Sequence, residues 1–150
     1  MSYQEKNITV SLMSFVLILG YYLTNVFQMY QAGGLVADRL FRLWAIVIVA
    51  GILVNILATI LTNIVLSIVH AIRTGKEESE RFIEDERDKL IELKGTKFSY
   101  IFYSIGVLIA MLTFVFGQPP LVMFSSIVLS SLVAEIIGDI AQIVLYRRGF

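Results

Sequence analysis

The chain has 150 residues, of which 57% are hydrophobic and 16% charged, and its mean hydropathy is +0.80. Twelve basic residues balance twelve acidic ones, and there is no cysteine. This composition excludes a soluble globular domain and is typical of an integral membrane protein, while the lack of cysteine excludes disulfides and thiolate metal sites.

Apolar runs long enough to cross a bilayer recur along the whole chain. A membrane helix needs about 20 mostly apolar residues, and the runs lie at 8–29, 43–69, 98–116 and 121–145. Gly33 and Gly34 mark the first short connection, and Pro119 and Pro120 mark the last. The sequence therefore predicts an all-α integral membrane protein. Its single domain, residues 1–150, would contain four transmembrane helices, with an amphipathic cytoplasmic helix between the second and third spans.

The second span carries a polar face. Asn55, Thr59, Thr62 and Asn63 fall on one side of a helix. Buried amides need hydrogen-bond partners, so Asn55 and Asn63 either join neighbouring helices or contribute to a binding or permeation site. We expect Asn63 to lie at the depth of the acidic residues of the fourth span.

Residues 73–97 form the one strongly polar segment, bounded by Gly75 and by a helix break expected at Gly95. Its positive and negative charges nearly balance, which disfavours nucleic acid and anionic lipid as partners. The segment is either a solvated helix packed on neighbouring helix ends or a docking surface for another protein. The candidate interaction residues are Phe82, Ile83, Asp85, Glu86, Arg87, Asp88, Leu90 and Leu93.

The third span presents small residues at three- and four-residue steps. Gly106 and Ala110 lie on this face, and Gly138 offers a small residue in the fourth span. Small side chains let helix backbones approach closely where lipid supplies no hydrophobic driving force. We therefore expect close helix packing here, within one chain or between copies of it.

The fourth span carries two acids near its middle. Ser131, Glu135, Gly138, Asp139 and Gln142 fall within about 100° of arc on a helix. A carboxylate at the bilayer centre costs at least about 2.5–3.5 kcal/mol. In a dry site at least one acid would be protonated and donate to a neighbouring polar group. In a wet site, or around an oligomer axis, the same residues could bind protons or cations.

The basic residues predict the orientation. Ten of the twelve lie near the termini or in 73–97, and only Arg39 and Arg42 lie on the opposite side. Because basic residues accumulate on the cytoplasmic side, both termini are expected there.

No motif indicates catalysis. The chain lacks a glycine-rich phosphate loop, a nucleophile elbow and a histidine pair, since His70 is the only histidine. We expect a non-enzymatic protein without cofactor or metal.

Two short motifs carry a resemblance. Asp85-Glu86-Arg87-Asp88, and the ending Leu145-Tyr146-Arg147-Arg148-Gly149 after Gln142, resemble an uncharacterised family of small four-span bacterial inner-membrane proteins, often encoded beside a helix-turn-helix regulator. The resemblance implies a bacterial inner-membrane location and a signalling role, and it supplies no catalytic or binding residues.

Two functions follow from these features. The first is a homo-oligomeric, multi-pass protein that signals through its cytoplasmic helix to a protein partner. The alternative is a small proton- or cation-conducting channel or carrier that uses Glu135 and Asp139.

Overall fold

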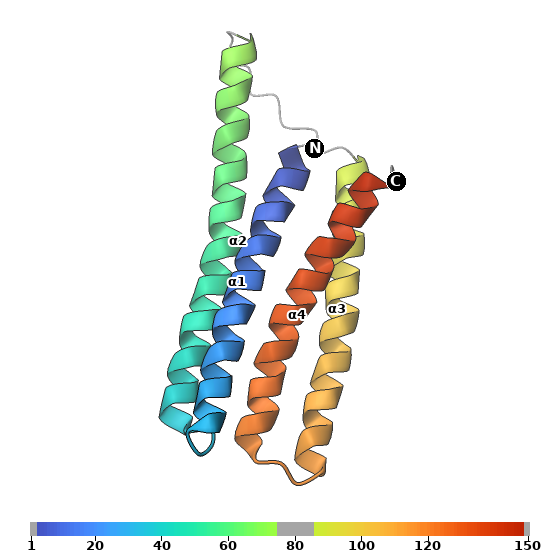
Figure 1. The fold of residues 1–150 in the computed structure, drawn as a ribbon. Coiled ribbons are helices and arrows are strands. Elements are labelled where there is room, and N and C mark those ends of the chain that lie inside the picture. The colour runs from blue at the N-terminus through green and yellow to red at the C-terminus, as the bar shows by residue number, and fades with distance from the viewer. Residues whose placement is uncertain (1–2, 75–85, 149–150) are drawn as a thin grey trace.

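The computed structural model describes residues 3–74 and 86–148 and consists there of four helices (Figure 1). These are α1 (Tyr3–Gln31), α2 (Ala37–Thr74), α3 (Glu86–Val115) and α4 (Pro120–Arg147). All four are long and apolar enough to cross a membrane, which confirms the predicted all-α class with four helices of membrane-spanning length. At 1.5 Å per residue, 28 or 29 residues extend about 42 Å, more than the ~30 Å hydrocarbon core of a bilayer.

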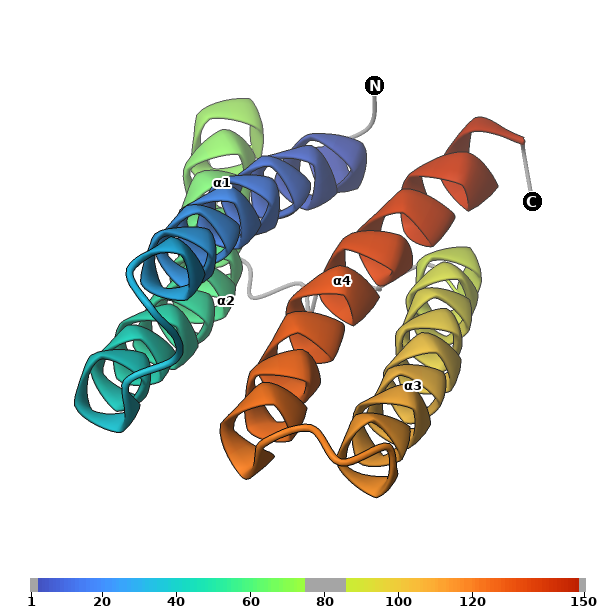
Figure 2. The ribbon, with the colours of Figure 1, turned by 60° about the horizontal axis from the view of Figure 1, so that its bottom comes forward.

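The helices stand side by side in the order α2, α1, α4, α3. The pair α3 and α4 makes the most extensive contact, α1 packs against α4 and α2, and no contact joins α2 to α3 within the described parts of the chain. Figure 2 shows α2 and α3 at the two edges of this arrangement. The start of α1 and the end of α4 lie at the same end of the helices, which we call the terminal end, and the two short connections lie at the opposite, loop end (Figure 1).

Glycine makes both short connections possible. Gly33, Gly34 and Gly117 have φ angles of 110°, 125° and 83°, a region that other residues rarely adopt. In each turn a backbone N–H reaches back five residues, from Gly34 to Met29 at 3.2 Å and from Gln118 to Thr113 at 3.1 Å. Pro120 then occupies the first turn of α4, where a missing N–H costs nothing.

A buried cluster joins α1, α2 and α4. Its members are Phe15, Tyr22, Leu40, Leu43, Trp44, Val47 and Leu132. The Tyr22 hydroxyl donates to the Ser125 carbonyl of α4 at 2.8 Å, which satisfies the polar end of an otherwise buried ring. The rings of Trp44 and Phe124, with centroids 6.2 Å apart, connect α2 to α4. This cluster fixes α1 between its two neighbours.

Small residues set the close spacing of α3 and α4. A Cβ atom at Gly106 would lie 2.5 Å from the Cβ of Ser130, and one at Gly138 would lie 3.3 Å from the Gly95 carbonyl oxygen. Ala110 is fully buried at the same contact face of α3. The backbones can approach this closely only because these positions lack larger side chains.

The helix break predicted at Gly95 is wrong. Helix α3 runs without interruption from Glu86 to Val115, so the third span is continuous with the end of the polar segment. Gly95 is buried, and a Cβ there would overlap the Gln142 side chain of α4. The glycine serves a helix contact here instead of ending a helix. A separate cytoplasmic helix, with Phe82, Ile83 and Asp85, falls on residues outside the described parts.

Candidate functional site

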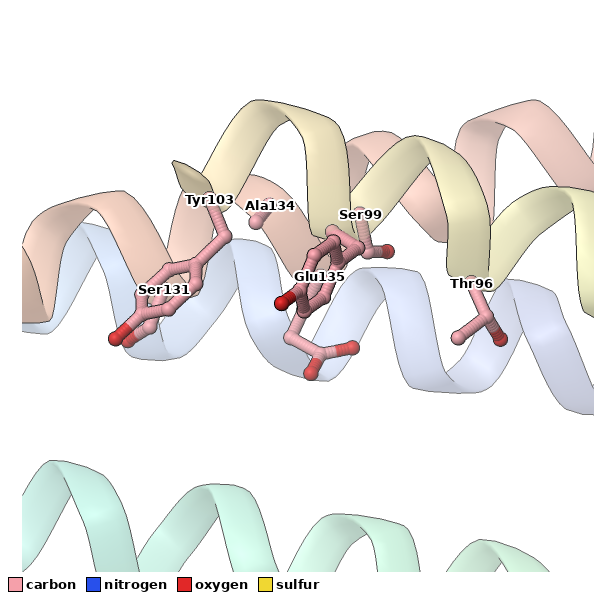
Figure 3. Close-up of a pocket in the computed structure, with 7 residues that line it drawn as sticks. Thr96, Ser99, Tyr103, Ser131, Ala134 and Glu135 are labelled. Atoms are coloured by element: carbon pink, nitrogen blue, oxygen red, sulfur yellow. The ribbon is translucent and has the colours of Figure 1, made fainter. Parts of the chain in front are cut away.

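An open groove runs over α3 and α4 near their middles (Figure 3). It has a volume of about 320 Å³. We call it the Glu135 groove, and its lining residues are Thr96, Ser99, Tyr100 and Tyr103 from α3 and Ser131, Ala134 and Glu135 from α4. The close approach of the two helices described above brings these seven residues together.

Glu135 is the one carboxylic acid among the lining residues, which include no lysine, arginine or histidine, and it is exposed. Within the described residues, no hydrogen bond or ion pair reaches its carboxylate. Figure 3 shows that carboxylate directed away from the backbones of α3 and α4. Glu135 precedes Arg147 by twelve residues, about 18 Å along the helix, so the unpartnered acid lies near the middle of a potential span.

The other polar groups of the groove are hydroxyls. The Ser131 hydroxyl donates its proton to the Val128 carbonyl at 2.8 Å, which leaves its oxygen lone pairs able to accept. Tyr100 is 72% exposed, and Tyr103 and Thr96 are exposed beside it. The groove therefore combines one carboxylate, several hydroxyl oxygens and two aromatic rings.

Asp139 has different surroundings from Glu135. It is only 9% exposed and does not line the groove. The Ser11 hydroxyl of α1 faces its carboxylate, while its Oδ2 atom has no partner among the described residues. The two acids, four residues apart on one helix, thus face different neighbours, Asp139 toward α1 and Glu135 toward the groove.

The remaining members of the predicted polar site are dispersed. Gln142 packs over Gly95, and Gly138 contacts Ser99, so both belong to the α3–α4 contact. Asn55 lies on α2, where its amide donates to the Gly51 carbonyl at 3.2 Å, and it does not line the groove. The side chain of Asn63 lies outside the described residues, so its predicted position opposite the acids stays a prediction.

A second polar contact joins three helices at the terminal end. The Tyr146 hydroxyl of α4 donates to Oδ1 of Asp88 in α3 at 2.9 Å and also contacts the Gln4 side-chain amide of α1. Asp88 and Tyr146 come from the two separate motifs on which the family resemblance rests. This junction ties the first turns of α3 to the ends of α1 and α4.

Four residues that α3 contributes to the Glu135 groove lie outside the site predicted from the sequence. These residues are Thr96, Ser99, Tyr100 and Tyr103. A signal existed, because Thr96, Ser99 and Tyr103 recur at three- and four-residue steps. The predicted polar segment ran to residue 97, which placed Thr96 outside the predicted third span.

Comparisons with known proteins give no family for the chain. No protein-family model matches it, and neither does any curated protein or solved structure. A functional assignment therefore depends on the chemistry of the Glu135 groove and of the terminal end.

Proposed function

We propose that this chain is a non-enzymatic, multi-pass membrane protein that carries protons or monovalent cations, with Glu135 as the binding group. The observation that supports the proposal is the Glu135 carboxylate, which is exposed and has no hydrogen bond or ion pair among the described residues, near the middle of a helix apolar enough to span a membrane. Such an acid requires a proton or a cation to offset the cost of its position in lipid.

The contrast between the two acids supports the same proposal. Acids retained in membranes for structural reasons pair with other protein groups. Asp139 fits that description at one of its two oxygens, because it is buried and faces Ser11, while its Oδ2 has no partner among the described residues. Glu135 lies in an open groove with hydroxyl oxygens around it, so a proton or cation bound there can leave again.

Flux measurements on purified protein in liposomes test this proposal. Under an imposed gradient of protons or sodium, we expect the parent to exceed empty liposomes and Glu135→Gln to fall to the empty-liposome rate. Glu135→Asp should keep part of the flux because it retains the charge. Glu92→Gln is the matched control, since it removes an exposed carboxylate of α3 outside the groove.

Two results would contradict the proposal. Parent liposomes that are no leakier than empty ones, under gradients of either direction, would exclude conduction. Flux that is unchanged in Glu135→Gln would exclude Glu135 as the binding group.

A second candidate function is signalling through the start of α3. Leu90 and Leu93 are 50% and 66% exposed in this charged part of the helix. Leu90 and Leu93 are three residues apart and so lie on one side of the helix, where together they offer an apolar surface that a partner could cover. We propose as this alternative that a cytoplasmic protein or a neighbouring copy of the chain covers them, with the protein in a bacterial inner membrane.

Replacing both leucines by serine tests this alternative. The double variant Leu90→Ser and Leu93→Ser should insert normally but lose a cytoplasmic partner or self-association, because the apolar contact area is gone. Co-purification after mild cross-linking in membranes measures the loss. Phe116→Ser, an exposed apolar residue at the loop end, is the control. Identical partners for parent and double variant would remove this candidate.

A further inference from the structure

The Glu135 groove has the dimensions of a small-molecule site. Its volume of about 320 Å³ falls in the lower part of the range of roughly 300–1,000 Å³ found for ligand pockets. A bare monovalent metal ion would fill little of that space. The groove is also open along the side of two potential membrane helices, so a ligand could enter it from the lipid.

The charge of the groove selects a monovalent cation. Glu135 is the one acid in the lining, and neither lysine nor arginine lies there to neutralise it. A calcium or magnesium ion would need six or more oxygen ligands. The described residues contain no group of three acidic, histidine or cysteine side chains that could hold a metal ion.

Two aromatic rings beside the carboxylate favour an organic cation. Tyr100 and Tyr103 both line the groove and both are exposed. Aromatic faces attract ammonium and related cations, and they also cover the apolar part of such a molecule. The hydroxyls of Thr96, Ser99 and Ser131 are further oxygen acceptors for N–H groups.

We propose that the Glu135 groove binds a monovalent organic cation with an apolar body, its charge beside Glu135 and its apolar groups over Tyr100 and Tyr103. This inference rests on the proposed function, since it names the class of cation taken at the same carboxylate.

A second groove provides an internal comparison. Leu23, Thr24, Val26, Phe27 and Tyr30 of α1 line an open groove of about 490 Å³ that contains no charged residue. It offers apolar surface and a tyrosine without a carboxylate. An organic cation that binds merely by its apolar groups would use both grooves, whereas one selected by charge would use the Glu135 groove.

Binding of tetraphenylphosphonium to the purified full chain in detergent tests the inference. This probe has one permanent positive charge and an apolar surface, and triphenylphosphine oxide serves as its neutral counterpart. By equilibrium dialysis, Glu135→Gln should weaken binding of the cation at least tenfold, with Glu135→Asp between the two. Tyr100→Leu and Tyr103→Leu should each raise the Kd by about 2- to 30-fold, the range expected for a cation–π contact. Tyr30→Leu in the second groove should leave the Kd unchanged.

The outcomes separate this inference from the proposed function. Equal binding by parent and Glu135→Gln, or equal binding of the neutral probe, would overturn the inference by showing apolar partitioning alone. An absence of tetraphenylphosphonium binding, together with Glu135-dependent flux of protons or sodium, would overturn the inference and leave the proposed function in place. An absence of both binding and flux would contradict both the inference and the proposed function. Parent-like elution and melting of each variant exclude unfolding as the cause.

Discussion

Replacing Gly106 by leucine is expected to force α3 away from α4 and to lower the stability of the protein in detergent. Even a Cβ atom at this position would lie 2.4 Å from Oγ and 2.5 Å from Cβ of Ser130. The Cβ of Ser130 is fixed to the backbone, so the clash can be relieved only if the helices separate. Overpacking in a tight contact typically costs about 1–3 kcal/mol, and leucine adds three further carbon atoms. The loss of stability is measured by heating the protein and quantifying the folded protein that remains by size-exclusion chromatography.

Two comparisons make this prediction specific. Gly20→Leu is the matched control, because no atom lies within 4 Å of a Cβ built at Gly20 in α1. The pair Gly106→Ala and Ser130→Gly should be non-additive, since removing the Ser130 side chain removes the clashing atoms. A Gly106→Leu protein that melts and elutes like the parent would mean that α3 and α4 do not approach closely at this point.

The helices were predictable because their signals are local. Apolar runs of membrane length, and glycine and proline between them, gave the four spans and both short connections. The small-residue spacing of the third span likewise pointed to Gly106 and Ala110, which lie against α4 in the structure. Each of these inferences needs only the order of residues along one helix.

Gly95 illustrates a limit of local reasoning. Its low helix propensity indicates a break, at a cost of about 1 kcal/mol relative to alanine inside a helix. The structure places the Gln142 side chain where a Cβ of residue 95 would be. Contact with a residue 47 positions away along the chain decides the role of this glycine, and no window of sequence around it contains that information.

The two acids illustrate a second limit. Helical spacing places Glu135 and Asp139 close together, and it suggests a single polar site with Gln142. Which helix covers each residue depends on the order in which the helices pack. Because α1 lies against one side of α4 and α3 against another, Asp139 is buried beside Ser11 while Glu135 opens into the groove. The junction of Gln4, Asp88 and Tyr146 was unpredictable for the same reason, since each residue comes from a different helix.

Cysteine labelling is expected to give an all-or-none pattern across the membrane. The chain contains no cysteine, so single introduced cysteines report without background. Val36 and Gln118 are exposed at the loop end, one in each short connection, and Arg148 is exposed at the terminal end. With the terminal end facing the cytoplasm, as the distribution of basic residues in the sequence predicts, Val36→Cys and Gln118→Cys should react with a membrane-impermeant thiol reagent in intact cells. Arg148→Cys should react only after the cells are permeabilised.

Two other labelling patterns would contradict this prediction. The reverse pattern would mean that the protein has the opposite orientation in the membrane. Labelling of just one of the two connections would contradict the pairing of α1 with α2 and of α3 with α4 as membrane-crossing hairpins.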